Sequence, residues 1–281
     1  MRNPAVAGQF YPGTKDSLTK AVEQCFFSSV GPRKIPLEVE GHPRFGVAPH
    51  AGYVFSGPTA ARTISAMASH IKNTIVIIGP NHTGTGGAID VSLEDFSIPT
   101  GVLKNDVSLG QALIKNGLEA GEESHRREHS LEVQLPLIQR VNPQAKITPV
   151  ILGDQSWSSV RKAADVISAC ISEDDVVLAS SDFTHCGINY GQSVPKETDA
   201  GNYARQRDAL AIEKALLLDA RGFLDVVYKN QISVCGAGPV AAVMEIAKMQ
   251  GASRGVLLEY ITSYDISPGP MAVGYASIVF V

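Results

Sequence analysis

Short apolar runs alternate with amphipathic stretches along most of the chain. Six runs rich in β-branched and aromatic residues begin near residues 45, 74, 147, 175, 255 and 272, and their lengths are typical of β-strands. The first four do not alternate polar and apolar residues, which favours strands that are covered on both faces. The pattern predicts an α/β fold.

Helical stripes separate several of these runs. Apolar residues recur three or four positions apart around residues 60–67, 160–170 and 240–247, so each stretch presents one apolar face to the sheet. Residues 88–101 alternate loosely and end in Pro-Thr-Gly, which predicts an antiparallel excursion, and residues 187–203 predict a long polar loop. Since α/β chains of this length often form one domain, we predict a single domain over residues 1–281 with a central mixed β-sheet and helices on both faces.

Composition narrows the class of protein. The 281 residues are 44% hydrophobic and 19% charged, with a net charge of −4, which argues against an electrostatic surface for nucleic acid or for a membrane. No apolar run approaches the roughly 20 residues of a membrane span, and the N-terminal residues lack the apolar core of a signal peptide. We therefore expect a cytoplasmic protein whose partners are small molecules or proteins.

Titratable side chains follow three of the predicted strands. His50 follows the first run and His82 the second, and Asp182 and His185 follow the run that begins near residue 175. The carboxyl ends of strands in an α/β sheet form the edge where ligands bind. A single histidine is often an ordinary buried residue, but three at one edge indicate a site.

Cys235 adds a sulfur to this set. It precedes Gly236, and the apolar stripe that follows predicts a helix that begins just after it, so the helix dipole is expected to favour the thiolate. The alternative is a small buried hydrophobic residue. Together His50, His82 and Cys235 are suited to zinc, copper or iron and would leave a coordination position open. Asp182 and His185 could then orient a bound water or carry a proton.

The segment HRREH provides a competing pattern. Its histidines, His125 and His129, match the HxxEH pattern of zinc peptidases in which the glutamate is the general base. Pro136 falls where the third or fourth turn of that helix would be, and it would break or kink the helix. We therefore favour a surface turn that directs His129 into the same site as His50, with a zinc peptidase at His125 and His129 as the weaker alternative.

Six sequence blocks occur in order along the chain: AVAGQFYPG, APHAGYVFSG, GPNHTG, EHSLEVQLP, SSDFTH and VCGAGP. Together they closely resemble the Memo family, which is similar in fold to class III extradiol dioxygenases of the LigB type. The resemblance implies a single α/β domain with a metal cleft at one edge of a mixed sheet. The site residues that it implies are His50, His82 and Cys235 as metal ligands, His185 with Asp182 as the acid/base pair, and Tyr53, Asn81 and His129 as substrate-binding residues of the cleft.

Two functions follow from this resemblance, and both stay open at this point. The first is a redox enzyme that holds one transition-metal ion, iron or copper with zinc as a further option, and acts on a small substrate. The thiolate of Cys235 replaces the carboxylate of non-heme iron oxygenases, so ring-cleavage chemistry does not follow from the fold. The second is a non-enzymatic module that captures a peptide or partner protein in the same cleft. The resemblance also implies an association with radical-SAM and AMMECR-type proteins.

Overall fold

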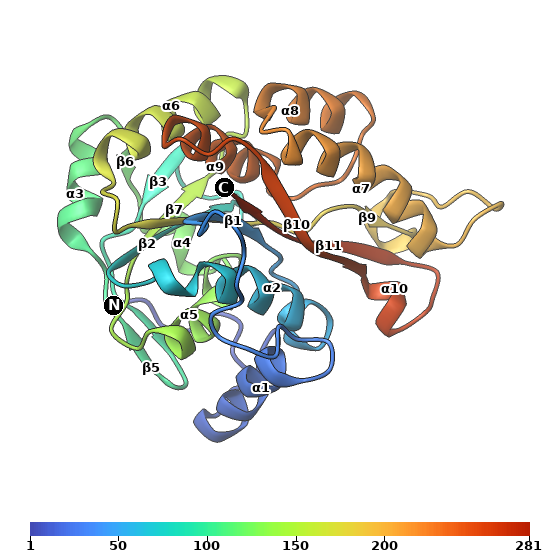
Figure 1. The fold of residues 1–281 in the computed structure, drawn as a ribbon, viewed down its shortest axis with the longest axis horizontal. Helices are drawn as coiled ribbons and strands as arrows, with labels where there is room; N and C mark the ends of the chain where they lie inside the picture. The colour runs from blue at the N-terminus through green and yellow to red at the C-terminus, as the bar shows by residue number, and fades with distance from the viewer.

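A nine-stranded mixed sheet lies at the centre of the protein, between two layers of helices (Figure 1). The computed structural model describes residues 1–281. The strand order is β10-β11-β1-β8-β2-β7-β3-β6, with β9 paired to β11, and β4 and β5 form a separate hairpin. The strands are β1 (Phe45–Ala48), β2 (Thr74–Pro80), β3 (Ile89–Val91), β4 (Phe96–Ile98), β5 (Gly101–Leu103), β6 (Glu119–Ala120), β7 (Lys146–Leu152), β8 (Val176–Ser180), β9 (His185–Cys186), β10 (Gly255–Thr262) and β11 (Ala272–Phe280).

Ten α-helices and three 3₁₀ turns connect and cover these strands. The α-helices are α1 (Lys15–Phe27), α2 (Tyr53–Met67), α3 (Val107–Lys115), α4 (Glu123–Arg126), α5 (Leu135–Val141), α6 (Trp157–Cys170), α7 (Ala200–Leu216), α8 (Ala220–Lys229), α9 (Ala237–Met249) and α10 (Ser263–Ile266). The 3₁₀ turns are η1 (Ala68–His70), η2 (Glu132–Gln134) and η3 (Ile188–Tyr190). No helix combines the length and the apolar composition that crossing a bilayer requires.

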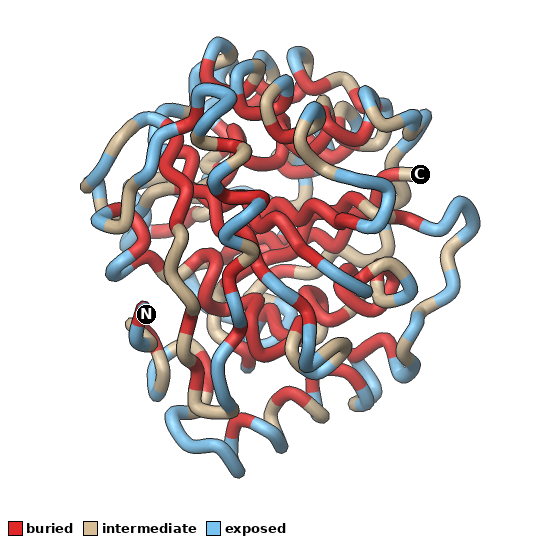
Figure 2. The backbone as a smooth tube through the Cα atoms, turned by 90° about the vertical axis from the view of Figure 1, so that its left-hand side faces the viewer, coloured by how far each residue is buried: buried red, intermediate tan, exposed pale blue.

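The two helical layers follow from the alternation of side chains along each strand. In β2, Val76 and Ile78 belong to the buried cluster that contains residues of α6, α8 and α9. Ile75 and Ile77 belong to the other cluster, with residues of α1, α2 and α5. Figure 2 shows the buried residues concentrated in the middle of the molecule and the exposed ones mainly in its outer turns and loops. The predicted sheet with helices on both faces is therefore confirmed.

All six predicted strands are present, and the three predicted helical stripes lie on α2, α6 and α9. The excursion over residues 88–101 is antiparallel, because β3 runs antiparallel to β7 and β4 runs antiparallel to β5. The predicted loop over residues 187–203 needs correction at its end, since α7 begins at Ala200. Asp199 caps this helix by accepting a hydrogen bond from the backbone N–H of Asn202 at 2.8 Å, as N-cap aspartates commonly do.

The sheet order sets the position of the site. The strands β1, β8 and β2 are parallel neighbours, with β8 in the middle. His50, Asp182 and His82 each lie two residues beyond the end of one of these strands. Three side chains that are far apart in the sequence therefore meet at one edge of the sheet.

Candidate metal centre

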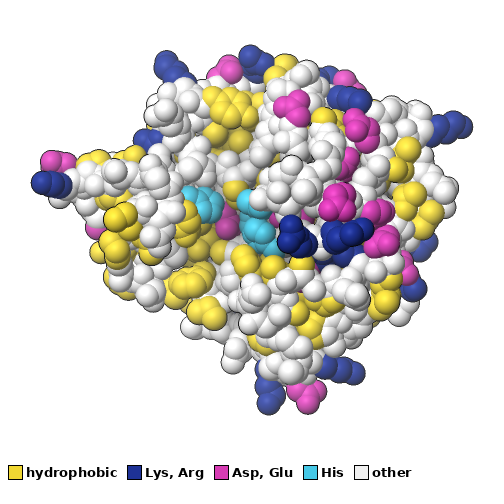
Figure 3. Space-filling model, turned by 180° about the vertical axis from the view of Figure 1, so that it is seen from behind, with side chains coloured by type: hydrophobic (Ala, Val, Ile, Leu, Met, Phe, Trp, Pro, Cys, Tyr) yellow, Lys and Arg dark blue, Asp and Glu magenta, His cyan; other side chains and the backbone are white.

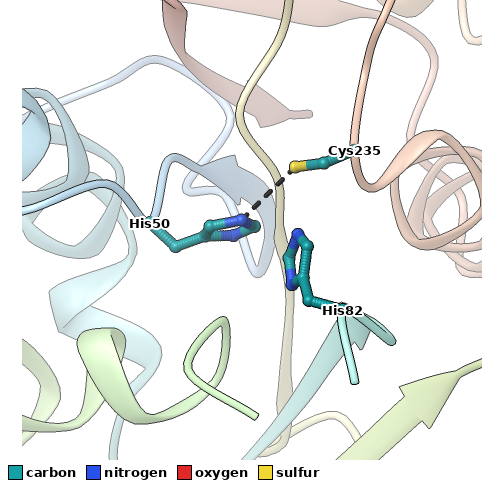
Figure 4. A group of neighbouring side chains, drawn as sticks. All are labelled: His50, His82 and Cys235. Atoms are coloured by element: carbon teal, nitrogen blue, oxygen red, sulfur yellow. Dashed lines mark hydrogen bonds between the residues drawn. The ribbon is translucent and has the colours of Figure 1, made fainter. Parts of the chain in front are cut away.

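The structure brings His50, His82 and Cys235 together at this edge. The Nε2 atom of His50 lies 3.3 Å from the Sγ atom of Cys235. The three side chains each offer a ligand atom within 4.8 Å of the other two, and Figure 4 shows both imidazole rings beside the sulfur. Two nitrogens and one sulfur at these separations form a ligand set that suits zinc, copper or iron.

Hydrogen bonds fix the orientation of the His50 ring. Its Nδ1 atom lies 3.0 Å from the hydroxyl oxygen of Ser180, which donates its own hydrogen to the carbonyl of Ser130 at 2.6 Å. Ser180 must therefore accept a hydrogen from Nδ1, which leaves the Nε2 lone pair directed at Cys235. Burial and the neighbouring histidines, His129 first, lower the pKa of His50 well below its usual value. The ring is thus held in the neutral form that binds metals.

Glu128 fixes the His82 ring in a similar way. One carboxylate oxygen accepts a hydrogen bond from the backbone N–H of His82 at 2.6 Å, and the other lies 2.8 Å from its Nδ1 atom. The second oxygen also accepts from the backbone N–H of Ser130 at 2.9 Å. Burial acts to raise the pKa of Glu128, but the bonds from His82 and Ser130 outweigh it and lower the pKa to about 2. An ionised carboxylate behind a histidine is the arrangement that orients many metal ligands.

Cys235 precedes α9, as predicted, and its glycine neighbour allows a close approach to β8. A Cβ atom on Gly236 would lie 2.7 Å from the Cβ of Ser181, so a larger residue would push Cys235 away. The Sγ atom accepts a hydrogen bond from the backbone N–H of Asp182 at 3.2 Å. The expectation that the helix end favours the thiolate needs correction: burial, followed by the charge of Asp182, raises the pKa of this thiol.

His185 and Asp182 lie beside the three candidate ligands. The Nδ1 atom of His185 lies 2.8 Å from the carbonyl of Phe183 and 3.0 Å from that of Ser233. Because both neighbours only accept, Nδ1 carries a hydrogen, so in the neutral form of the ring the lone pair is on Nε2. Asp182 accepts a hydrogen bond from the backbone N–H of His50 at 2.7 Å. Burial raises the pKa of this carboxyl group, although the nearby His185 acts to lower it.

A cleft of about 610 Å³ opens in front of these residues. Its lining includes His50, His82, His129, Asp182 and His185. Figure 3 shows histidine side chains in a hollow of this face, with hydrophobic side chains on one side of them and charged side chains on the other. The ring of His129 packs against that of His82, with centroids 4.5 Å apart, and against Phe10 at 4.6 Å. Burial and the charge of His82 lower the pKa of His129 to about 4.

Tyr53 and Asn81 lie elsewhere than the resemblance implies. The Tyr53 hydroxyl donates to the carbonyl of Val133 at 2.9 Å, and its side chain lines a separate cavity of about 810 Å³. The amide of Asn81 closes the turn after β2, where it accepts from the backbone N–H of Gly84 at 2.9 Å and donates to the carbonyl of Thr85 at 2.6 Å. Neither residue is among those that line the cleft.

The HRREH segment does not form the helix that the peptidase pattern requires. Helix α4 ends at Arg126, and α5, which begins at Leu135, has Pro136 in its first turn. His125 is buried with its Nε2 atom 3.2 Å from the carbonyl of Asp90, whereas His129 lines the cleft. The segment is also less of a surface turn than predicted, because Glu128 is buried as well.

Glu128 and Ser180 orient the candidate ligands His82 and His50, and neither was predicted as a site residue from the sequence. A carboxylate directly before the cleft histidine His129, in the block EHSLEVQLP, is a signal that points to Glu128. Ser180 ends β8, two residues before Asp182, so its position at the end of a strand also indicates a site residue. Gln134 donates to the Ser180 hydroxyl oxygen at 2.9 Å, but no local pattern connects these two residues.

Comparisons with known proteins agree with the whole-chain resemblance. The model of the family described as "Memo-like protein" matches residues 2–279. A MEMO1 family protein of Methanopyrus kandleri is 38% identical to this chain over 99% of the chain and 98% of the relative. A MEMO1 family protein of Methanosarcina acetivorans is 37% identical over the same shares of both chains. A MEMO1 family protein of Nitrosopumilus maritimus is 36% identical over the full length of both chains. With one family model and relatives matched over almost their entire length, the chain belongs to the Memo-like protein family.

Proposed function

We propose that this protein binds one transition-metal ion through His50, His82 and Cys235 and that it acts as a metal-dependent redox enzyme on a small substrate. The observation that carries the proposal is the convergence of three ligand atoms within 4.8 Å of one another. The three residues come from different parts of the sequence, and a core built only for packing has no need of such a cluster.

The donor set fits an ion of borderline softness. Both imidazoles are oriented through Nδ1, His50 by Ser180 and His82 by Glu128, so Nε2 is available on each. Iron or copper, with zinc as a further option, would find two nitrogens and a sulfur here. A bound ion of this kind supplies Lewis acidity, and iron or copper also supplies one-electron chemistry.

The residues beside the ligands are suited to proton transfer. Two carbonyls hold the Nδ1–H of His185, so its Nε2 is the atom that would accept or donate a proton in the cleft. Burial raises the pKa of the Asp182 carboxyl group above its usual range, which favours a proton-carrying role for it. The family resemblance also implies these two residues as the acid/base pair. Non-heme iron oxygenases bind the metal through two histidines and a carboxylate, and Cys235 would take the place of that carboxylate here. We therefore favour redox chemistry other than ring cleavage.

The direct experiment measures metal content. Protein purified without a histidine tag is analysed by inductively coupled plasma mass spectrometry as wild type, as Cys235→Ser and as Cys170→Ser. Cys170 is a matched control because it ends α6, away from the cleft. The expected result is one metal ion per chain in the wild type and the control, and its loss in Cys235→Ser. Metal retained by Cys235→Ser would rule out Cys235 as a required ligand.

A second measurement separates the redox enzyme from the binding module. Protein loaded with copper or iron is reduced with ascorbate and then exposed to air, and electron paramagnetic resonance follows the oxidation state. A redox site cycles reversibly between the two states. A metal that stays in one oxidation state throughout would reject the redox function and favour capture of a peptide or partner protein.

A further inference from the structure

We propose that the cleft selects a small molecule whose polar end reaches the metal and whose remaining part is apolar and uncharged. The inference rests on the proposed function, because it takes the metal as the anchor for the polar end. It goes further by naming the chemical class of the ligand, which follows from the composition of the cleft walls.

The first observation is the absence of cationic side chains. None of the eighteen residues that line the cleft is a lysine or an arginine, and the only carboxylate among them is Asp182. Arg126 and Arg127, close by in the sequence, line a different cavity with the N-terminal residues. Recognition of phosphate or carboxylate groups usually depends on arginine or lysine. The lining of the cleft therefore contains no arginine or lysine to bind an anionic ligand, and the basic side chains beside the histidines in Figure 3 are not part of that lining.

The second observation is that apolar residues line the cleft both at its buried inner end and near its mouth. His50 and Asp182, at the inner end, are only 2% and 4% exposed. Tyr275 and Val273 in the same lining are 2% and 7% exposed, whereas Phe55 and Tyr190 are 37% and 45% exposed and lie nearer the mouth. A ligand whose polar group reaches the candidate metal ligands would therefore contact apolar side chains along the rest of its length.

The third observation is the nature of the outer walls. Phe55 lies in the first turn of α2, and the opposite lining comes from the segment after α10, which contains Pro268, Pro270 and Met271. Prolines and aromatic rings lose little conformational freedom on binding, so such walls form a ready apolar slot.

Apolar side chains continue beyond the mouth. Ile188 and Ile266 are 86% and 42% exposed and belong to η3 and α10, and the nearby residues Tyr190 and Ser267 line the cleft. The volume of about 610 Å³ is within the range of small-molecule sites. These features fit an apolar ligand body that extends from the metal to the rim.

A series of N-alkylimidazoles tests this inference. N-ethylimidazole, N-butylimidazole and N-hexylimidazole share a neutral metal-binding head and differ only in apolar length, and N-hexylimidazole with a terminal carboxylate adds one negative charge. Binding is measured by isothermal titration calorimetry on the full-length protein carrying its metal, with the metal content of every sample determined first. Phe55→Ser shortens the apolar wall. Leu217→Ser is the matched control, because Leu217 is 63% exposed and does not line the cleft.

We expect the Kd to fall by up to about fourfold for each added methylene, which corresponds to about 0.8 kcal/mol per buried methylene. The hexyl compound should bind more than tenfold tighter than the ethyl compound, and its carboxylate analogue should lose that gain. Phe55→Ser should weaken the dependence on chain length, while Leu217→Ser keeps it. Equal affinities along the series, or tight binding of the carboxylate analogue, would overturn the inference and leave the metal site standing. A protein that holds no metal would instead refute the proposed function, and this inference with it.

Discussion

Glu128→Gln is the most informative single change at this site, because it alters the support of a candidate ligand and leaves the ligand itself in place. Glu128 is 2% exposed, and its carboxylate accepts hydrogen bonds from the backbone N–H and the ring Nδ1–H of His82 and from the backbone N–H of Ser130. Glutamine keeps the size of the side chain but replaces one acceptor oxygen with an NH₂ donor. At least one of the three N–H groups then faces another donor.

The size of the effect follows from these contacts. A hydrogen bond to a charged group contributes about 1.5–3 kcal/mol, and the variant loses one such bond together with the charge that favours the Nδ1–H form of His82. Changes to the residues that orient metal ligands typically weaken metal binding about 10–100-fold. We therefore expect the Kd for copper or zinc to rise by about one to two orders of magnitude.

The assay is a competition titration against a chelator of known affinity, with folding checked by circular dichroism. Glu122→Gln is the matched control, since the Glu122 carboxylate also accepts two hydrogen bonds, from the Ser92 hydroxyl at 2.6 Å and the Leu93 backbone N–H at 2.7 Å, but contacts no histidine. An affinity of Glu128→Gln within about twofold of wild type would refute the reasoning. An equal loss in both variants would also refute it, because it would assign the effect to general destabilisation.

Three further predictions follow from buried groups. Arg2→Met should lower the free energy of unfolding by about 3–5 kcal/mol in urea denaturation, because it leaves the buried carboxylate of Glu132 without its partner at 2.5 Å; a loss below about 1 kcal/mol would contradict this. His125→Ala should keep the metal and His50→Ala should lose it, as measured by mass spectrometry. The opposite result would favour a zinc site at His125 and His129. In metal-free folded protein, the pKa of His129 is about 4, against 6.5 for an ordinary histidine. As the pH drops from 6.5 to 4, His129 therefore gains a proton in the unfolded chain but not in the folded protein, and the free energy of unfolding falls. The melting temperature of His129→Gln should fall less over that pH range than that of the wild type. Identical pH profiles of the two proteins would contradict this prediction.

The strands and the strand-end residues could be predicted because their signals are local. A run of five to seven apolar residues identifies a buried strand, and the polar residue that follows it lies at the edge of the sheet by the geometry of parallel strands. His50, His82 and Asp182 were found in this way. The depression of the His50 pKa and the elevation of the Cys235 pKa could not be predicted, because both depend on burial by distant segments.

The positions of Tyr53 and Asn81 could not be predicted from the sequence blocks that contain them. Both residues belong to blocks that contain a candidate ligand, and proximity in sequence suggested proximity in the cleft. Tyr53, however, is the first residue of α2. Its side chain lies on the side of the sheet that α1 covers, where it lines the cavity of about 810 Å³. Asn81 uses its amide to close the turn that places His82. A short block therefore contains residues that build the site as well as residues that line it.

The N-terminal block (residues 5–13) and the block EHSLEVQLP (residues 128–136) contact each other, although they lie far apart in the sequence. Glu132 accepts hydrogen bonds from the backbone N–H of Ala5 at 2.7 Å and of Val6 at 3.0 Å, and from the Tyr11 hydroxyl at 2.5 Å. These contacts hold the chain so that Phe10 packs on His129 and forms part of the cleft wall. A buried carboxylate that accepts several hydrogen bonds tolerates few replacements, so the same residue that stabilises the N-terminal segment also shapes the entrance to the metal.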